Sequence, residues 1–324
     1  MNRLIFLDIA KAICIMLVVI GHYIPQDSPD WWKEINRIIY SFHMPLFLFA
    51  SGVAYMISKK NNYYEFIIKK VKRLMIPYFT VSIFVIVTKL LADSFLTVDN
   101  PKQINSLLRM FYYPEAGYFL WFIWVLFLSF LIVPFFKSRK SRLALLASSL
   151  ILFLGNFELT EIFCIRQFGQ FFIFFILGAV AYDYKDKIKS ILNINALFYI
   201  LAFAGLYYFS SGEKTIAGRA ELFIINITGI TMILSISRYI EKINFGKGLF
   251  MTVSSASYII YLLHTAAEGF AKALIAKTGL PLESDLIFAL AAIIVTACGV
   301  IIPILLYNHI IKRHKATRIL FGLS

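Results

Sequence analysis

Residues 7–25 read LDIAKAICIMLVVIGHYIP, an apolar run interrupted by a few ionisable side chains. The run is long enough to cross a bilayer as an α-helix, which needs about 20 mainly apolar residues. Yet it carries an acid, a base and an imidazole: Asp8, Lys11 and His22. An ionisable side chain inside a membrane helix costs roughly 2.5–3.5 kcal/mol on insertion scales, so it usually faces protein or a water-filled cavity. We therefore expect this helix to line a polar site inside a larger bundle.

The composition is that of a membrane protein. Of the 324 residues, 60% are hydrophobic and 15% are charged, whereas a soluble domain is about half apolar and a quarter charged. The apolar runs are continuous and helix-length, which favours helices over the short alternating strands of a β-barrel. The sequence predicts one all-α integral-membrane domain over residues 1–324. Ten spans are predicted, at 4–24, 38–57, 74–92, 118–136, 142–156, 168–183, 195–211, 220–237, 253–271 and 286–310.

The distribution of positive charge predicts the topology. With the N-terminus in the cytoplasm, lysine and arginine are more than twice as frequent in the inner segments as in the outer ones. This positive-inside bias predicts that both termini are cytoplasmic. It also explains the net charge of +14 without a nucleic-acid partner. The three cysteines lie far apart and have no metal or redox spacing, so no metal site is expected.

Three histidines are candidates for the chemistry. His22 follows Lys11 by eleven residues, so both side chains share one face of the first helix, about 16 Å apart. His43 begins the second predicted span in YSFHMPLFLFASGVAY. His264 and Glu268 belong to a polar stripe on the ninth span, with spacing i, i+4, i+7 and i+11. In the predicted topology all three histidines lie in the outer half of the membrane, where they can converge on one cavity.

A basic cluster lies on the cytoplasmic side, in YEFIIKKVKRLMIPYF (residues 64–79). Such a cluster suits a ligand with several phosphates, although a topology signal with lipid headgroup contact is the simpler explanation at this place. For His43 the alternative is a structural role, bonding a backbone carbonyl freed by Pro45. Asp8 is expected to pair with Lys11 three residues later. The basic cluster of residues 64–79 comprises Lys69, Lys70, Lys72 and Arg73.

These segments resemble the membrane-bound acyltransferase-3 family over nearly the whole chain. FLDIAKAICIMLVVIGH (6–22) is similar to the family's opening helix, whose signature is a basic residue, ten others and a histidine, here Lys11 and His22. FHMPLFLFASG (42–52) is similar to a motif of the fucose 4-O-acetylase-like branch. KVKRLMIPYF (70–79) is similar to the R-x-x-x-R region, with Lys69 in place of the first Arg and Arg73 as the second. Lysine keeps the charge but loses the planar bidentate fork of arginine.

The resemblance implies a multi-pass O-acyltransferase of the inner (cytoplasmic) membrane, surrounded by membrane lipids. It would move an acyl group, usually acetyl, from cytoplasmic acyl-CoA to a hydroxyl of a cell-envelope carbohydrate or glycolipid. Acyl-CoA is then a substrate, and no permanently bound cofactor is expected. The acceptor sugar, the acyl group and the choice between direct transfer and an acyl-histidine stay open.

The resemblance also assigns roles to the residues. His22 is expected to be the general base, a role that contributes about 10²–10⁴-fold in rate, with His43 and His264 orienting it or binding the acceptor. Asp8 and Glu268 are supporting residues. The donor phosphates are assigned to Lys11, Lys69, Lys70, Lys72 and Arg73.

Two other functions are compatible with a polar tract through a helical bundle. A transporter or flippase for a glycolipid or small polar solute is the main alternative, although no paired repeat with broken helices is found in the sequence. A membrane scaffold of an envelope pathway is the second, and it would not depend on His22.

Overall fold

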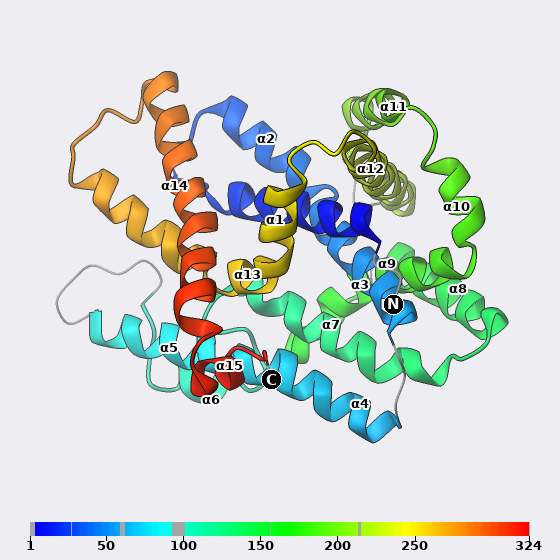
Figure 1. Cartoon of the computed structure of the whole chain (residues 1–324), viewed down its shortest axis with the longest axis horizontal. Coiled ribbons are helices and arrows are strands. Elements are labelled where there is room, and N and C mark those ends of the chain that lie inside the picture. Colours follow the sequence, from blue (N-terminus) through cyan, green and yellow to red (C-terminus); the bar gives the residue numbers. More distant parts are fainter. Residues whose placement is uncertain are drawn as a thin grey trace. The chain divides into compact units, whose positions relative to one another are not determined.

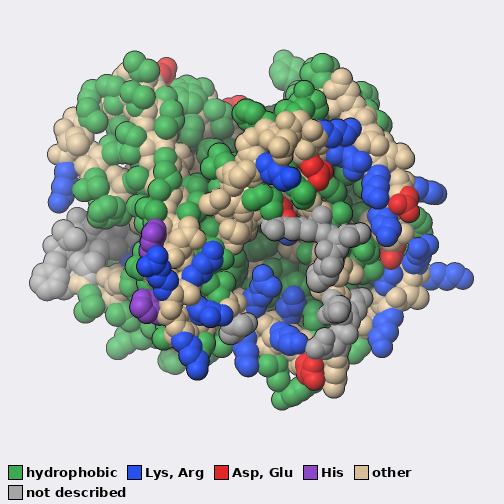
Figure 2. Space-filling view, viewed as in Figure 1, with side chains coloured by type: hydrophobic (Ala, Val, Ile, Leu, Met, Phe, Trp, Pro, Cys, Tyr) green, Lys and Arg blue, Asp and Glu red, His purple; other side chains and the backbone are tan. Residues whose placement is uncertain are grey.

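The computed structural model of the protein describes residues 4–26, 28–58, 62–92, 101–155, 157–212 and 215–323. Within these ranges the chain is all-helical and contains no strand, which confirms the predicted fold class. Hydrophobic side chains cover wide areas of the face seen in Figure 2. An apolar surface of this extent is unusual for a soluble monomer and is expected for a protein in lipid.

Each of the ten predicted spans contains a helix. Within the described ranges, eight helices are long and apolar enough to cross a membrane. A ninth is added if α10 (Lys185–Ile191) and α11 (Ala196–Tyr208), which are bent by 83°, form one broken span. The fifth predicted span is α8 (Arg139–Gly155), with 17 residues; its predicted last residue, 156, lies outside the described residues. The count of ten and the cytoplasmic position of both termini therefore stay predictions.

The chain divides into two compact units, and the prediction of a single domain stays a prediction. Unit 1 comprises Met1–Ile57 and Leu177–Asn308, and unit 2 comprises Ser58–Ile176 and His309–Ser324. The chain passes from unit 2 to unit 1 within α9 (Ile165–Asp183) and back within the π-helical turn η5 (Tyr307–Ile311).

Unit 1 is built around its first helix, α1 (Ile5–His22) (Figure 1). α1 contacts α2, α3, α12, α13 and α14. Because protein surrounds α1, its polar side chains meet other helices in place of lipid, as the opening stretch of sequence predicts. These five helices are α2 (Asp30–Tyr40), α3 (His43–Ile57), α12 (Ile216–Ile243), α13 (Lys247–Ala276) and α14 (Asp285–Leu306). Unit 1 also contains α10 and α11.

Glycines let the helices of unit 1 approach closely. A Cβ on Gly178 of α9 would collide with the backbone carbonyl of Phe49 in α3. A Cβ on Gly229 of α12 would lie 2.6 Å from the Cβ of Phe42. Small residues at such crossings are the usual means by which membrane helices pack.

Unit 2 carries the basic cluster on a nearly continuous helical run. α4 (Tyr63–Lys70) leads through the π-helical turn η1 (Val71–Met75) into α5 (Ile76–Ala92), and both α4 and η1 contact α7 (Trp121–Ile132). The remaining elements of unit 2 are α6 (Ser106–Arg109), η2 (Tyr118–Leu120), η3 (Val133–Phe135), α8, η4 (Ile162–Cys164) and α15 (Lys315–Leu320).

Candidate active site

His22 is the last residue of α1, and its ring meets residues from two other helices of unit 1. The helix ends here because the next residue, Tyr23, leaves the helical conformation and Pro25 follows shortly after. The imidazole of His22 lies edge to face with that of His264, with ring centroids 4.9 Å apart. The ring of Tyr40 lies on another side, 6.4 Å away between centroids.

His264 is fully buried in α13 and its orientation is fixed by the backbone. Its Nδ1 donates to the carbonyl of Tyr261 at 2.8 Å and to that of Ile260 at 3.1 Å. A carbonyl oxygen only accepts, so Nδ1 carries the proton. In the neutral ring the basic lone pair is then on Nε2, the side that can act on another group.

His43 begins α3 and is held in the same way. It is 2% exposed, and its Nδ1 donates to the carbonyl of Ile39 at 2.7 Å. The carbonyl that Pro45 leaves without a helical N–H partner is that of Ser41. His43 therefore makes a hydrogen bond to a backbone carbonyl, but to that of Ile39 and not to the one freed by Pro45. The ring of Tyr40 lies edge to face with His43 at 4.9 Å. The ring of Tyr40 therefore contacts those of both His43 and His22, and the structure brings all three predicted histidines into one cluster in unit 1.

Glu268 lies one helical turn after His264 and is 1% exposed. Among the described residues its Oε1 has no hydrogen-bond partner. A buried carboxyl oxygen without a hydrogen bond destabilises the fold unless it is protonated or accepts a hydrogen bond from water or a ligand. The carboxyl group fits because the facing residue of α14 is Gly299, whose Cβ, if present, would lie 3.1 Å from Oε1.

Asn36 of α2 supplies a second buried oxygen, close to Gly21 of α1. The side chain is 3% exposed, and its Nδ2 donates to the carbonyl of Trp32 at 2.9 Å. Its Oδ1 has no hydrogen-bond partner in the part of the chain that the structure describes. A Cβ on Gly21, the neighbour of His22, would lie 3.8 Å from that oxygen. Two buried acceptors, from Asn36 and Glu268, thus accompany the histidines.

At the other end of α1, Asp8 and Lys11 form the predicted ion pair. Lys11 Nζ lies 3.8 Å from Asp8 Oδ1, and both side chains are largely buried. Ser254 of α13 donates a long hydrogen bond, 3.4 Å, to the same oxygen of Asp8. α1 and α13 therefore run side by side in the same direction, with Asp8 beside Ser254 at one end and His22 beside His264 at the other.

In unit 2, three members of the basic cluster line one pocket of about 400 Å³. They are Lys69, Lys72 and Arg73, and the C-terminal residues Gly322 and Leu323 complete the lining. The three cations belong to α4 and η1, and π-helical turns of this kind are frequent at functional sites. The pocket is wide enough for a polyanionic group and lined by fixed positive charge.

Lys70 does not share this pocket. Its Nζ lies over the ring of Phe130, 3.7 Å from the centroid, and 5.1 Å from that of Phe66. This is a cation–π arrangement inside unit 2. Lys11 lies in unit 1 and is engaged with Asp8. The structure therefore groups three of the five residues assigned to donor phosphates.

Comparison with protein families decides the class. The acyltransferase-3 family model, described as an acyltransferase domain, matches residues 4–308. The chain belongs to the acyltransferase-3 family. It is therefore a membrane acyltransferase, in agreement with its apolar helices and with the resemblance of its sequence. No curated protein and no solved structure matches the chain.

Several residues of the candidate site do not stand out in the sequence. Tyr40 lies three residues before His43, and a polar ring so close to a membrane histidine is a usable signal. Gly299 is a small residue within an apolar span, which signals close packing but not its partner. Gly322 and Leu323 give no signal at all, because their partners lie far away in the sequence.

Proposed function

We propose that the protein is an O-acyltransferase that moves an acyl group, acetyl in the simplest case, from cytoplasmic acyl-CoA to a hydroxyl of a cell-envelope carbohydrate or glycolipid. Membership of the family supports acyl transfer. The observation that best supports base-assisted transfer to a hydroxyl is the edge-to-face pair of His22 and His264, with ring centroids 4.9 Å apart. The inner membrane and the fucose 4-O-acetylase-like branch are parts of the same proposal.

In the proposed reaction His22 is the general base. The acceptor hydroxyl gives its proton to His22 while its oxygen bonds to the carbonyl carbon of the thioester. The carbon–sulfur bond then breaks, and the proton passes from His22 to the sulfur of the leaving coenzyme A. Histidine suits both steps because its ordinary pKa lies near neutral pH.

The neighbours of His22 have separate roles in this scheme. His264 is a positioning residue, because its Nδ1 is bound to backbone carbonyls and its ring abuts that of His22. Asn36 Oδ1 and Glu268 Oε1 are suited to accept hydrogen bonds from hydroxyls of the acceptor. A sugar presents several such donors, whereas a purely apolar acceptor would leave both buried oxygens unsatisfied.

The basic pocket of unit 2 is assigned to the phosphates of acyl-CoA. Charge-assisted hydrogen bonds from lysine and arginine to phosphate are about twice as strong as neutral ones. Lys69, Lys72 and Arg73 provide them from adjacent turns. Lys70, engaged with Phe130, has no part in the assignment.

Mass spectrometry of envelope glycans tests the acceptor part of the proposal. Glycans from wild-type cells, cells without the protein and cells complemented with the wild type or with His22→Ala are compared. We expect one acyl mass to be lost from one sugar in the deletion and in the His22→Ala strain. Identical acylation in all four strains would contradict the proposal, and accumulation of an intact acylated precursor would favour the transporter or flippase.

A further inference from the structure

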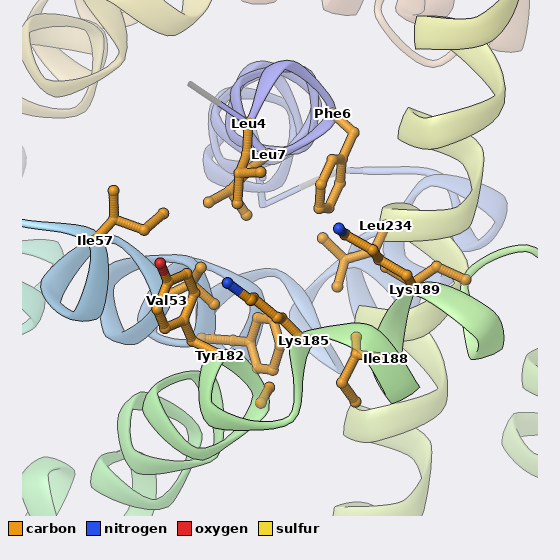
Figure 3. A pocket seen from close by; sticks show the side chains of 13 residues that line it. Leu4, Phe6, Leu7, Val53, Ile57, Tyr182, Lys185, Ile188, Lys189 and Leu234 are labelled. Atoms are coloured by element: carbon orange, nitrogen blue, oxygen red, sulfur yellow. The ribbon is translucent and has the colours of Figure 1, made fainter. Parts of the chain in front are cut away.

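Unit 1 contains a cavity of about 190 Å³, and none of the three histidines lines it. Leu7 of α1, Val53 of α3 and Leu234 of α12 contribute to an apolar lining. Lys185 and Lys189 of α10 are the charged residues of the lining (Figure 3). Figure 3 shows both ammonium groups reaching from α10 toward the start of α1. An apolar chamber with two cations over it matches a ligand that has one apolar chain and one anionic head.

The cavity is small. Pockets for drug-sized ligands are usually about 300–1,000 Å³, so a cavity of about 190 Å³ suits a smaller group than a whole nucleotide. A segment of a single hydrocarbon chain does. The chain would bury apolar surface against Leu7 and Val53, while the head stays at the rim beside the exposed lysines.

The position of α10 identifies the source of such a ligand. The helix follows directly on α9, a candidate membrane span, and the chain bends by 83° before α11. A short basic helix that adjoins the end of a span lies at the level of lipid headgroups, where lysines attract anionic lipids. Lys185 Nζ lies 5.6 Å from the centroid of the Tyr182 ring, which is itself part of the lining. Lys189 makes an exposed, 3.8 Å contact with Asp186, and such surface pairs contribute little. Both lysines are therefore available to a phosphate.

We propose that this cavity is a binding site for an anionic phospholipid, with the phosphate on Lys185 and Lys189 and part of one acyl chain in the apolar chamber. The site is separate from the transfer chemistry and does not depend on it. It would anchor α10 against α1 and α3 when lipid is bound. A neutral lipid lacks the charge that the two lysines recognise.

Native mass spectrometry of the purified full chain in detergent tests this site, with phosphatidylglycerol as the probe and phosphatidylcholine as the neutral control. Lys185→Gln with Lys189→Gln should weaken phosphatidylglycerol binding by about thirtyfold, the effect of removing two lysines near a lipid phosphate. Lys187→Gln with Lys242→Gln removes the same charge from exposed positions outside the lining. That control should keep most of the affinity. Equal loss in the two double variants would overturn the proposal.

Two further measurements test the chain-binding part. Val53→Phe fills the chamber and should weaken phosphatidylglycerol binding without changing the lysines, with folding checked by thermal unfolding. Unchanged binding by the folded variant would show that no chain enters and would overturn the site. Soluble glycerol phosphate should not displace the lipid at equal concentration, and displacement would reduce the site to a simple anion contact. The lysine variants are exposed, so this comparison stands even if Val53→Phe does not fold.

Discussion

Glu268 of α13 is accommodated by the absence of a side chain on Gly299 of α14. A Cβ on Gly299 would lie 3.1 Å from Glu268 Oε1 and 2.6 Å from Val19 Cγ1 of α1. Three helices of unit 1 therefore meet at this glycine, one turn along α13 from His264. The packing of the bundle and the chemistry of the site are coupled at one position.

Gly299→Ala should displace Glu268 or push α14 away from α1. Overpacking of this kind costs about 1–3 kcal/mol, so the melting temperature and the acyl-transfer rate should both fall. Gly269→Ala is the control, because it adds the same methyl group on α13 where no atom lies within 4 Å. In a helix that change is neutral or stabilising by about 0.4–1 kcal/mol. Thermal unfolding of the purified variants measures the difference, and equal melting temperatures would contradict the close contact.

His264→Ala should lower kcat with little change in KM for acyl-CoA. In the proposed site the side chain positions His22, and a lost buried hydrogen-bonding group costs about 1–3 kcal/mol, which is about 5- to 150-fold in rate. His264→Asn keeps a donor near the place of Nδ1, whereas His264→Gln keeps a polar group near that of Nε2. If positioning acts through Nε2, the Gln variant retains more activity and shifts the pH profile less than the Asn variant. Wild-type kinetics in all three variants would remove His264 from the site.

Lys69→Gln, Lys72→Gln and Arg73→Gln should each raise KM for acyl-CoA by about tenfold, as expected for the loss of one charge-assisted bond to phosphate. Because the contact is far from the reacting bond, kcat should stay close to the wild-type value. Lys70→Gln removes the same charge next to the pocket but leaves its lining intact, so its KM should change little. Calorimetric titration with coenzyme A provides an independent affinity. A larger effect at Lys70 than at its three neighbours would contradict the assignment.

The C-terminal turn should matter to the same pocket. Gly322 has a φ of 70°, and a Cβ there would lie 2.7 Å from the carbonyl oxygen of Arg73. Gly322→Ala is therefore expected to move the turn off η1 and to weaken acyl-CoA binding. Gly212→Ala has a similar positive φ of 64° in open space, so it separates backbone strain from collision. Equal KM values for the two variants would argue against a contribution of the C-terminus.

The sequence predicts the fold well because lipid imposes strict rules. Continuous apolar runs predict a helical bundle, and the polar stripe on the first helix predicts that other helices surround it. The structure confirms this, because α1 contacts five other helices. The ion pair of Asp8 and Lys11 followed from their spacing and is present. The number of membrane crossings is harder to predict from the sequence, because α8 has only 17 residues and α10 and α11 form a bent pair.

The site was only partly predictable, for a physical reason. The predicted topology places His22, His43 and His264 at a similar depth in the membrane, but depth alone does not give the rotation of each helix. The contact of Tyr40 with two imidazoles depends on that rotation, as does the direction of Lys70 toward Phe130. Spacing along one helix predicts neighbours on that helix, whereas contacts between helices depend on packing.

Transfer of labelled acetyl from acetyl-CoA by membranes containing equal amounts of protein tests the central claim most directly. His22→Ala is compared with the wild type and with His309→Ala, which removes an exposed histidine outside the cluster. We expect His22→Ala to lower transfer by about 10²–10⁴-fold at unchanged melting temperature, while His309→Ala matches the wild type. Wild-type transfer by a folded His22→Ala protein would contradict the central claim.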